Sequence, residues 1–290
     1  MIPIDHKILN VISYAIMFAA VSAPGRIDSQ VAKEIEAEES GSSAKVDDSS
    51  EQAKALTPIM GRTLVAPAGW AFAIWGPIFA GELVFVISQF FAKNGSALSE
   101  TIKSVSGPFV LAQTFQALWS ASFRPKYKGG LMWISSGMLG GIAYSMSKAH
   151  AVFSAASTRN TYTTLQYFIN FFPMALHFGW TTAATLVNIN GSVAVMKNLS
   201  SKFVAVVGHL SVVAATALGV FITTSRDAPV YGGVISWALF AVADGMKKRL
   251  EASQKDENVK DVTGVQLQLQ LSKIGAYISA AASIFTGFSK

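Results

Sequence analysis

The stretch PAGWAFAIWGPIFAGELVFVISQ, residues 67–89, lies within an apolar run that extends from residue 66 to residue 92. A membrane-spanning helix needs about 20 mainly apolar residues, so this run is long enough to cross a bilayer. Pro67 suits the first turn of a helix, where its missing N–H removes no hydrogen bond. Pro77 lies inside the run and predicts a kink near Ala73–Pro77. The stretch therefore predicts a kinked transmembrane helix.

The composition favours the same class of protein for the whole chain. Of 290 residues, 51% are hydrophobic and 14% are charged, whereas roughly a quarter of the residues of soluble domains are charged. The absence of cysteine excludes disulfides and zinc–thiolate sites. The net charge of +6 comes from short basic clusters between apolar runs, an arrangement typical of membrane topology and not of nucleic-acid binding.

Eight apolar runs predict an all-α, polytopic membrane helix bundle of about eight transmembrane helices. They cover approximately residues 8–23, 66–92, 106–123, 130–150, 163–190, 203–223, 230–246 and 269–288. We interpret the first run as a retained helix in preference to a signal peptide, because Pro24 follows the small residues that would precede a cleavage site. Residues 25–64 are acidic and serine-rich, which predicts a flexible loop.

The distribution of lysine and arginine predicts the orientation. With eight spans, the loops on one side carry 11 basic residues and those on the other side carry 7, with the acidic loop set aside. The positive-inside rule then places both termini on the non-cytoplasmic side. The sequence does not decide among plastid, mitochondrial and endomembrane locations.

One face of the second predicted helix combines aromatic rings with an acid. Phe72, Trp75, Phe79 and Glu82 follow one another at steps of three, four and three residues and therefore share a face. Trp70 lies about 140° away from Trp75 and is expected to face another helix or the membrane interface. A charge at the membrane centre costs several kcal/mol, so Glu82 must be protonated, paired or hydrated. Two interpretations stay open: Glu82 is a carboxyl group bonded to a neighbouring helix, or it is a polar group that binds a ligand or a proton.

The fifth predicted helix carries further polar candidates. His177 and Trp180 are three residues apart and are neighbours on one face, and Asn188 lies two turns further along roughly the same face. The imidazole can bond a carboxyl group, a porphyrin propionate or the magnesium of a chlorophyll. It can equally make an interhelical hydrogen bond of about 1 kcal/mol. The same alternatives hold for His209.

Small residues and further tryptophans have two interpretations each. Gly137, Gly141 and Ser145 repeat every four residues and allow helices to approach closely, either within the chain or in a homodimer. Three more tryptophans suit either an interfacial belt or a pocket wall: Trp119, Trp133 and Trp237.

Four motifs together resemble a known family. They are PAGWAFAIWG with the residues that follow it, FQALWSASF (Phe115–Phe123), FPMALHFGWTTAATLVNING (Phe172–Gly191) and RDAPVYGGVISWALFAV (Arg226–Val242). In this order they resemble the translocator protein/tryptophan-rich sensory protein (TspO/MBR) family, in a longer branch with additional helices. The resemblance implies a five-helix core followed by three C-terminal helices. The predicted division is a first helix at 1–24, the acidic loop at 25–64, the rest of the core at 65–192 and the extension at 193–290.

The resemblance also implies a function. The family is associated with porphyrins and other flat apolar ligands, including sterols, in a pocket beneath the loop that joins its first two helices. We therefore expect a receptor, carrier or sensor for a planar ligand, either a tetrapyrrole (porphyrin or chlorophyll) or a lipid such as a sterol. The expected ligand-binding residues are Phe72, Trp75, Phe79, Glu82, Trp119, His177, Trp180 and Asn188.

Other functions are weighed against this one. The chain has none of the G-x-S-x-G, P-loop or H-E-x-x-H motifs, so we do not expect an enzyme. One alternative is a structural or assembly subunit of a larger membrane complex, for example a photosynthetic complex that contains pigment. Another is a transporter coupled to protonation of Glu82. The expected partners are membrane lipids and a homodimer or larger complex, with no nucleic acid and no metal site.

Overall fold

A computed structural model describes residues 5–26, 62–127, 129–255 and 262–288 of the chain. Within these ranges the regular structure is entirely helical, as the sequence predicts. The long helices are α1 (His6–Ser22), α4 (Trp75–Ser88), α5 (Ala97–Ser122), α6 (Met132–Ser154), α9 (Phe172–Ala194), α10 (Ser201–Ser225), α11 (Pro229–Lys255) and α12 (Val265–Phe288). Two short helices, α7 (Ala156–Arg159) and α8 (Thr164–Asn170), connect α6 to α9. Most of the predicted acidic loop lies outside the described residues.

Each predicted span overlaps one of these long helices. Three helical segments satisfy length and hydropathy criteria for crossing a membrane. They are Gly69–Phe91, Ser201–Ser225 and Pro229–Gln254. The charged segment after residue 246 continues α11 as far as Lys255. The alternating sequence VQLQLQL forms the first two turns of α12. The fold is therefore that of a helical membrane protein.

The two prolines of the opening stretch shape its start. Pro67 precedes the helix, which begins as the 3₁₀ segment η1 (Gly69–Ile74) and becomes α-helical at Trp75. Pro77 has no N–H to donate to the carbonyl of Ala73, so a regular α-helical bond is missing at this junction. The predicted kink near Ala73–Pro77 takes the form of this change of helix type. A second 3₁₀ segment, η2 (Gln89–Phe91), ends the helix.

The fifth predicted run is divided into two helices. The helix α8 begins with a capping box at Thr163 and Gln166 and ends before Phe171, after which α9 starts. Pro173 occupies the first turn of α9, where it is tolerated, but it cannot continue a preceding helix. The sequence-based expectation of one helix from 163 to 190 is therefore wrong at its beginning.

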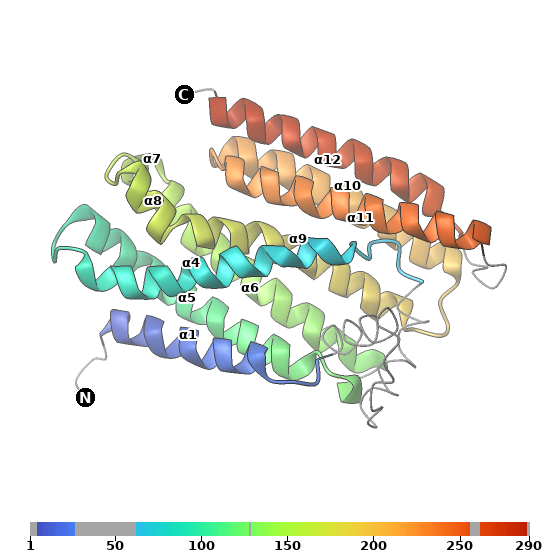
Figure 1. Ribbon diagram of the computed structural model, residues 1–290, viewed down its shortest axis with the longest axis horizontal. Coiled ribbons are helices and arrows are strands. Elements are labelled where there is room, and N and C mark those ends of the chain that lie inside the picture. Colours follow the sequence, from blue (N-terminus) through green and yellow to red (C-terminus); the bar gives the residue numbers. More distant parts are fainter. Residues whose placement is uncertain (1–4, 27–61, 128, 256–261, 289–290) are drawn as a thin grey trace.

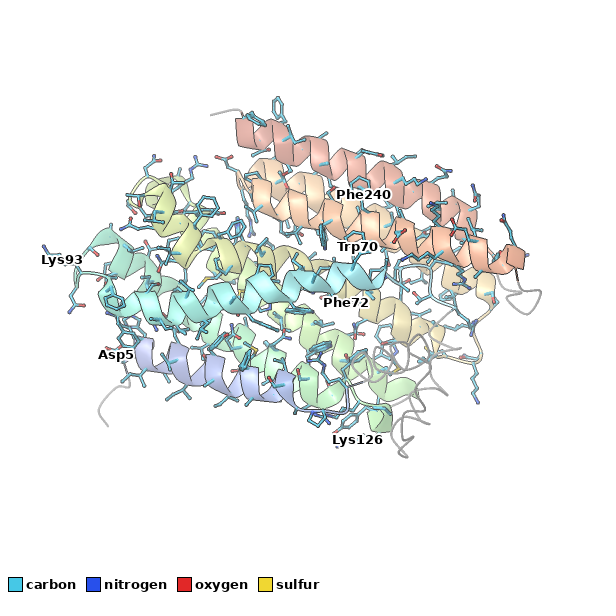
Figure 2. All side chains as sticks on the ribbon, in the orientation of Figure 1. Asp5, Trp70, Phe72, Lys93, Lys126 and Phe240 are labelled. Carbon is cyan, nitrogen blue, oxygen red and sulfur yellow. The ribbon has the colours of Figure 1, made fainter. Side chains whose placement is uncertain are left out.

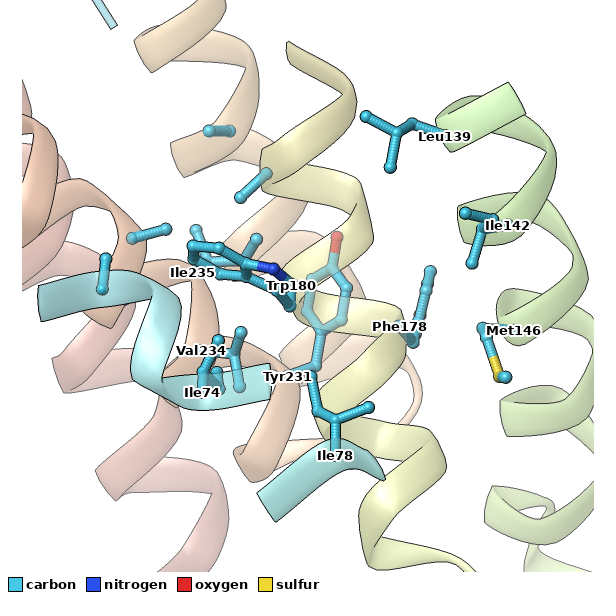
Figure 3. Packing of buried hydrophobic residues seen from close by; sticks show 14 of the residues in the cluster. Ile74, Ile78, Leu139, Ile142, Met146, Phe178, Trp180, Tyr231, Val234 and Ile235 are labelled. Carbon is cyan, nitrogen blue, oxygen red and sulfur yellow. The ribbon is translucent and has the colours of Figure 1, made fainter. Parts of the chain in front are cut away.

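The long helices run up and down along one axis, and α9 is the centre of the arrangement (Figure 1). It contacts α4 and α6 on one side and α10 and α11 on the other. Gly179 permits the approach to α11, because a Cβ atom there would lie 2.8 Å from the Cβ atom of Val234. Figure 3 shows Tyr231 and Val234 of α11 packed beside Phe178 and Trp180 of α9. The extension is thus continuous with the core.

Two of the three small residues in the predicted stripe of α6 pack within the chain. A Cβ atom on Gly141 would lie 2.8 Å from the ring of Phe115 in α5, and Ser145 is buried. Gly137 has open space around it. Intramolecular packing therefore accounts for two of the three residues in the predicted stripe.

Candidate functional site

The carboxyl group of Glu82 is fully buried and bonded to two neighbouring helices. Its Oε1 atom lies 2.7 Å from Nδ1 of His177 in α9, and its Oε2 atom accepts a hydrogen bond of 3.0 Å from Nε2 of Gln113 in α5. Both Glu82 and His177 are 0% exposed. The first interpretation of Glu82, a carboxyl group bonded between helices, is confirmed, and the pair belongs to the aromatic cluster described next.

The indole of Trp75 lies at the centre of an aromatic cluster. It stacks on Phe79 with ring centroids 4.9 Å apart and on Trp119 at 6.5 Å. The rings of His177 and Trp180 meet it edge-on at 5.7 Å and 6.2 Å. Rings from α4, α5 and α9 therefore converge on one tryptophan.

Phe72 extends this cluster toward the beginning of the helix. Its ring meets that of Trp180 edge-on at 5.7 Å, although its side chain is 42% exposed. Phe72, Trp75 and Glu82 all contact residues of α9, so the shared face predicted from their spacing is confirmed.

Several buried polar atoms of this cluster have no hydrogen-bond partner among the described residues. They are Nε2 of His177, the indole Nε1 atoms of Trp119 and Trp180, both amide atoms of Gln116, Oε1 of Gln113 and Oγ of Ser120. An unsatisfied buried polar group costs about 1–3 kcal/mol. Such groups are rare in native structures, and each one calls for an explanation. Three of these atoms belong to rings that contact Trp75, those of Trp119, His177 and Trp180, and this marks the region as the candidate site.

The helix α5 carries three polar residues on the face from which Gln113 reaches Glu82. Gln113, Gln116 and Ser120 are spaced by three and four residues, and each is fully buried. Sequence reasoning noted Gln116 only as part of a motif and missed Gln113 and Ser120. The signal available was this spacing of three polar residues within a predicted span.

The helix α1 closes another side of the site. The hydroxyl of Tyr14 donates to the main-chain oxygen of Phe79 at 2.8 Å, and the ring of Phe18 meets that of Phe79 edge-on at 6.5 Å. These contacts hold Phe79 in position below Trp75. The first helix is therefore part of the site's wall.

Asn188 lies apart from the other predicted site residues. Its Oδ1 atom accepts a hydrogen bond of 2.7 Å from Oγ of Ser135 in α6. Asn188 is eight residues from Trp180, and this spacing corresponds to about 12 Å along the helix axis. His209 also lies elsewhere, with its Nδ1 atom 2.6 Å from Oε1 of Gln268 in α12. The structure thus brings together Phe72, Trp75, Phe79, Glu82, Trp119, His177 and Trp180.

Trp70 has a different environment from Trp75, as its position on the helix predicts. Its Nε1 atom donates to Oδ2 of Asp244 in α11 at 3.0 Å, and its ring lies edge-on to Trp237 with centroids 4.6 Å apart. Trp237 in turn donates from Nε1 to the main-chain oxygen of Ala71 at 3.2 Å. Figure 2 shows Trp70 in the space between η1 and α11.

The main chain also joins the segment before Trp75 to α11. The N–H of Ala68 donates to the carbonyl of Ala241 at 2.9 Å. A Cβ atom on Gly245 would lie only 2.4 Å from the carbonyl oxygen of Ala66, so this close approach requires glycine. We call the contacts of residues 66–71 with Trp237, Ala241, Asp244 and Gly245 the α11 clamp. It fixes the start of the helix that carries Trp75.

The site's donors suit an organic ligand. Within the described ranges, no group of three or more His, Cys, Asp or Glu side chains could hold a metal ion. The cluster offers flat aromatic faces, three ring nitrogens and side-chain amides. This combination can bind a flat apolar molecule through its faces and a polar edge.

A comparison with protein families identifies the class of membrane protein to which this fold and site belong. The family described as TSPO-like protein matches residues 49–261, which is more than half of the chain. The chain belongs to the TSPO-like protein family, and the resemblance inferred from the four motifs is confirmed. The matched region extends from before α4 through α11 and so includes the α11 clamp. Comparisons with curated proteins and with solved structures returned no match.

Proposed function

We propose that this protein is a membrane receptor, carrier or sensor that binds a planar apolar ligand against the Trp75 cluster. The supporting observation is that one indole is surrounded by Phe79, Trp119, His177 and Trp180 while polar atoms beside it are buried without partners. Aromatic faces stack on flat ligands, and a few polar groups fix their orientation. Tetrapyrroles and sterols are the ligand classes that fit this description within the family.

The test is a titration of the purified protein in lipid nanodiscs with protoporphyrin. Saturable quenching of tryptophan fluorescence is expected. Trp75→Ala should weaken binding by about tenfold, because it removes stacking contacts worth about 0.5–1.5 kcal/mol each. The matched control is Trp133→Ala, since Trp133 is 42% exposed and lies outside the cluster. Unchanged affinity in Trp75→Ala would show that the ligand binds elsewhere.

We further propose that the eight long helices all span the membrane and that both termini face the non-cytoplasmic side. An even number of passes requires the two ends of the chain to be on one side. In agreement, α1 begins and α12 ends at the same end of the bundle (Figure 1). The helices that precede the basic loops, α5, α9 and α11, end at the other end of the bundle (Figure 1).

The chain has no cysteine, so single introduced cysteines can report this topology. Asn94 and Asn198 are exposed residues in loops separated by α5, α6 and α9. In sealed membranes, an impermeant maleimide added from the non-cytoplasmic side should label Asn94→Cys and leave Asn198→Cys unlabelled. Labelling of both from one side would contradict the eight-span topology, and the reverse pattern would contradict the orientation.

The buried Glu82–His177 pair favours one second candidate, proton-coupled transport. A carboxyl group and an imidazole in contact can hold and release a proton inside a membrane protein. Uptake of the ligand into liposomes should then depend on a pH gradient and be lost in Glu82→Gln. Uptake that does not change with the pH gradient would exclude proton-coupled transport. An assembly role in a larger complex stays a prediction, and the size of the particle in mild detergent checks it.

A further inference from the structure

We infer that the ligand of the Trp75 cluster carries an uncharged carbonyl oxygen on its buried edge, which accepts hydrogen bonds from His177 and Trp180. This inference rests on the proposed function and narrows its ligand class. It begins from two ring nitrogens on one face of α9, Nε2 of His177 and Nε1 of Trp180, both buried without partners. Both rings meet Trp75 edge-on, at 5.7 Å and 6.2 Å.

The indole nitrogen of Trp180 can only donate, because it has no lone pair available to accept. The role of His177 follows from its contact with Glu82. A pair with no net charge is favoured in a membrane interior, where an isolated charge is costly. Two such forms exist: an imidazolium beside a carboxylate, and an imidazole that accepts from a protonated carboxyl group through Nδ1. In both forms Nε2 of His177 carries a hydrogen, so it is a donor.

The site therefore presents two N–H donors three residues apart on α9, with no acceptor for either among the described residues. A ligand group that accepts two hydrogen bonds matches them, and a carbonyl oxygen has two lone pairs. A hydroxyl group matches both donors only if its own hydrogen also reaches an acceptor such as Oε1 of Gln113, which is buried without a partner. The amide of Gln116 is also unpartnered, but it can donate or accept and does not decide the ligand's polarity.

Charge excludes a carboxylate at the same position. Glu82 and His177 together have no net charge in the forms described, so a ligand carboxylate would add an unbalanced buried charge. A cation contacts the cluster at another place. The guanidinium of Arg26 lies 5.3 Å from the ring centroid of Trp119, and its Nη1 atom donates to the main-chain oxygen of Val21.

The experiment compares fluorene with fluorenone, two flat tricyclic probes that differ by a ring ketone. Both are titrated into the full-length protein in nanodiscs. Fluorenone should bind about tenfold more tightly, because its carbonyl oxygen accepts two hydrogen bonds that fluorene cannot make. Its carbonyl stretching frequency should fall on binding. Fluorene carboxylate at neutral pH should bind more weakly than fluorenone, and tighter binding would overturn the requirement for an uncharged group.

Two variants locate the carbonyl. Trp180→Phe removes one N–H, keeps an aromatic ring and leaves the Glu82–His177 contact in place, and His177→Phe removes the other N–H. Each should reduce the preference for fluorenone to a few-fold and partly reverse the shift of the carbonyl frequency. Trp133→Phe should change neither quantity. A full frequency shift in both α9 variants would overturn the assignment.

The possible failures are distinguishable. Equal binding of fluorene and fluorenone, with both weakened by Trp75→Ala, would overturn the carbonyl inference and leave the proposed function intact. It would mean that water satisfies the two donors. Binding that is insensitive to Trp75→Ala, or absent for every planar probe, would overturn the proposed function itself.

Discussion

The Nδ1 atom of His177 lies 2.7 Å from the Oε1 atom of Glu82, although 95 residues separate them in the chain. Both side chains are fully buried. The contact joins α4 to α9, and Gln113 extends it to α5. The same two helices supply Trp75 and Trp180, whose rings lie in contact. The hydrogen-bonded pair therefore sets the relative position of the aromatic walls of the site.

Glu82→Leu and His177→Leu should each destabilise the protein, because each leaves one buried polar partner unsatisfied. The double variant should lose less stability than the two single losses together. The coupling energy is expected to be about 1 kcal/mol, the usual size for interhelical hydrogen bonds in membranes. Denaturation of the four proteins in mixed micelles measures it. Additive losses would show that the two groups do not interact.

Trp70→Phe should lower stability by about 0.5–1.5 kcal/mol, since it removes the hydrogen bond to Asp244 and keeps most of the ring contact with Trp237. Thermal unfolding of the purified protein checks this. Asp244→Ala should have a similar effect, and combining the two changes should add little. Trp133→Phe is the matched control, because Trp133 has nearly the same exposure as Trp70. Equal losses in the control and in Trp70→Phe would contradict the role of the bond.

Gly245→Ala should destabilise the protein, because the added Cβ atom would meet the carbonyl oxygen of Ala66 at 2.4 Å. Gly137→Ala is the control: it is also in a helix, and a Cβ atom there meets nothing within 4 Å. Alanine favours a helix over glycine by about 1 kcal/mol, so the control should be neutral or stabilising. Thermal unfolding distinguishes the two. A stable Gly245→Ala protein would mean that residues 66–68 do not approach α11 this closely.

Asn188→Leu should leave the affinity for a planar ligand unchanged while reducing stability, because Asn188 bonds Ser135 in α6 and lies away from Trp75. Ser135→Ala should behave in the same way. Fluorescence titration and thermal unfolding give the two quantities. A large loss of affinity in both variants, with stability preserved, would place Asn188 in the site after all.

Local sequence patterns predict part of this structure. Hydropathy locates the helices because a membrane span needs a long apolar run, and the spacing of Phe72, Trp75 and Glu82 predicts their common face because a helix repeats every 3.6 residues. The same helical repeat places Trp70 and Trp75 on different faces of the helix. These predictions succeed because each depends on the geometry of a single helix.

Relationships between helices are harder to predict. Hydropathy indicates that Glu82 needs a partner but does not choose between His177 and His209, which both lie in predicted spans. Gln113 carries no charge and gives no signal of its own. The α11 clamp depends on the 3₁₀ geometry of Gly69–Ile74 and on the close approach that Gly245 permits, and neither follows from a hydropathy pattern.

The hydrogen bond from Ala68 to Ala241 also bears on the order in which the protein is made. During synthesis the helix that carries Trp75 leaves the ribosome long before α11 has been translated. Until then, Ala68 and Trp70 lack their partners on α11, and the start of that helix has no fixed neighbour. The candidate site therefore reaches its final geometry only late in biogenesis, after nearly the whole chain has entered the membrane.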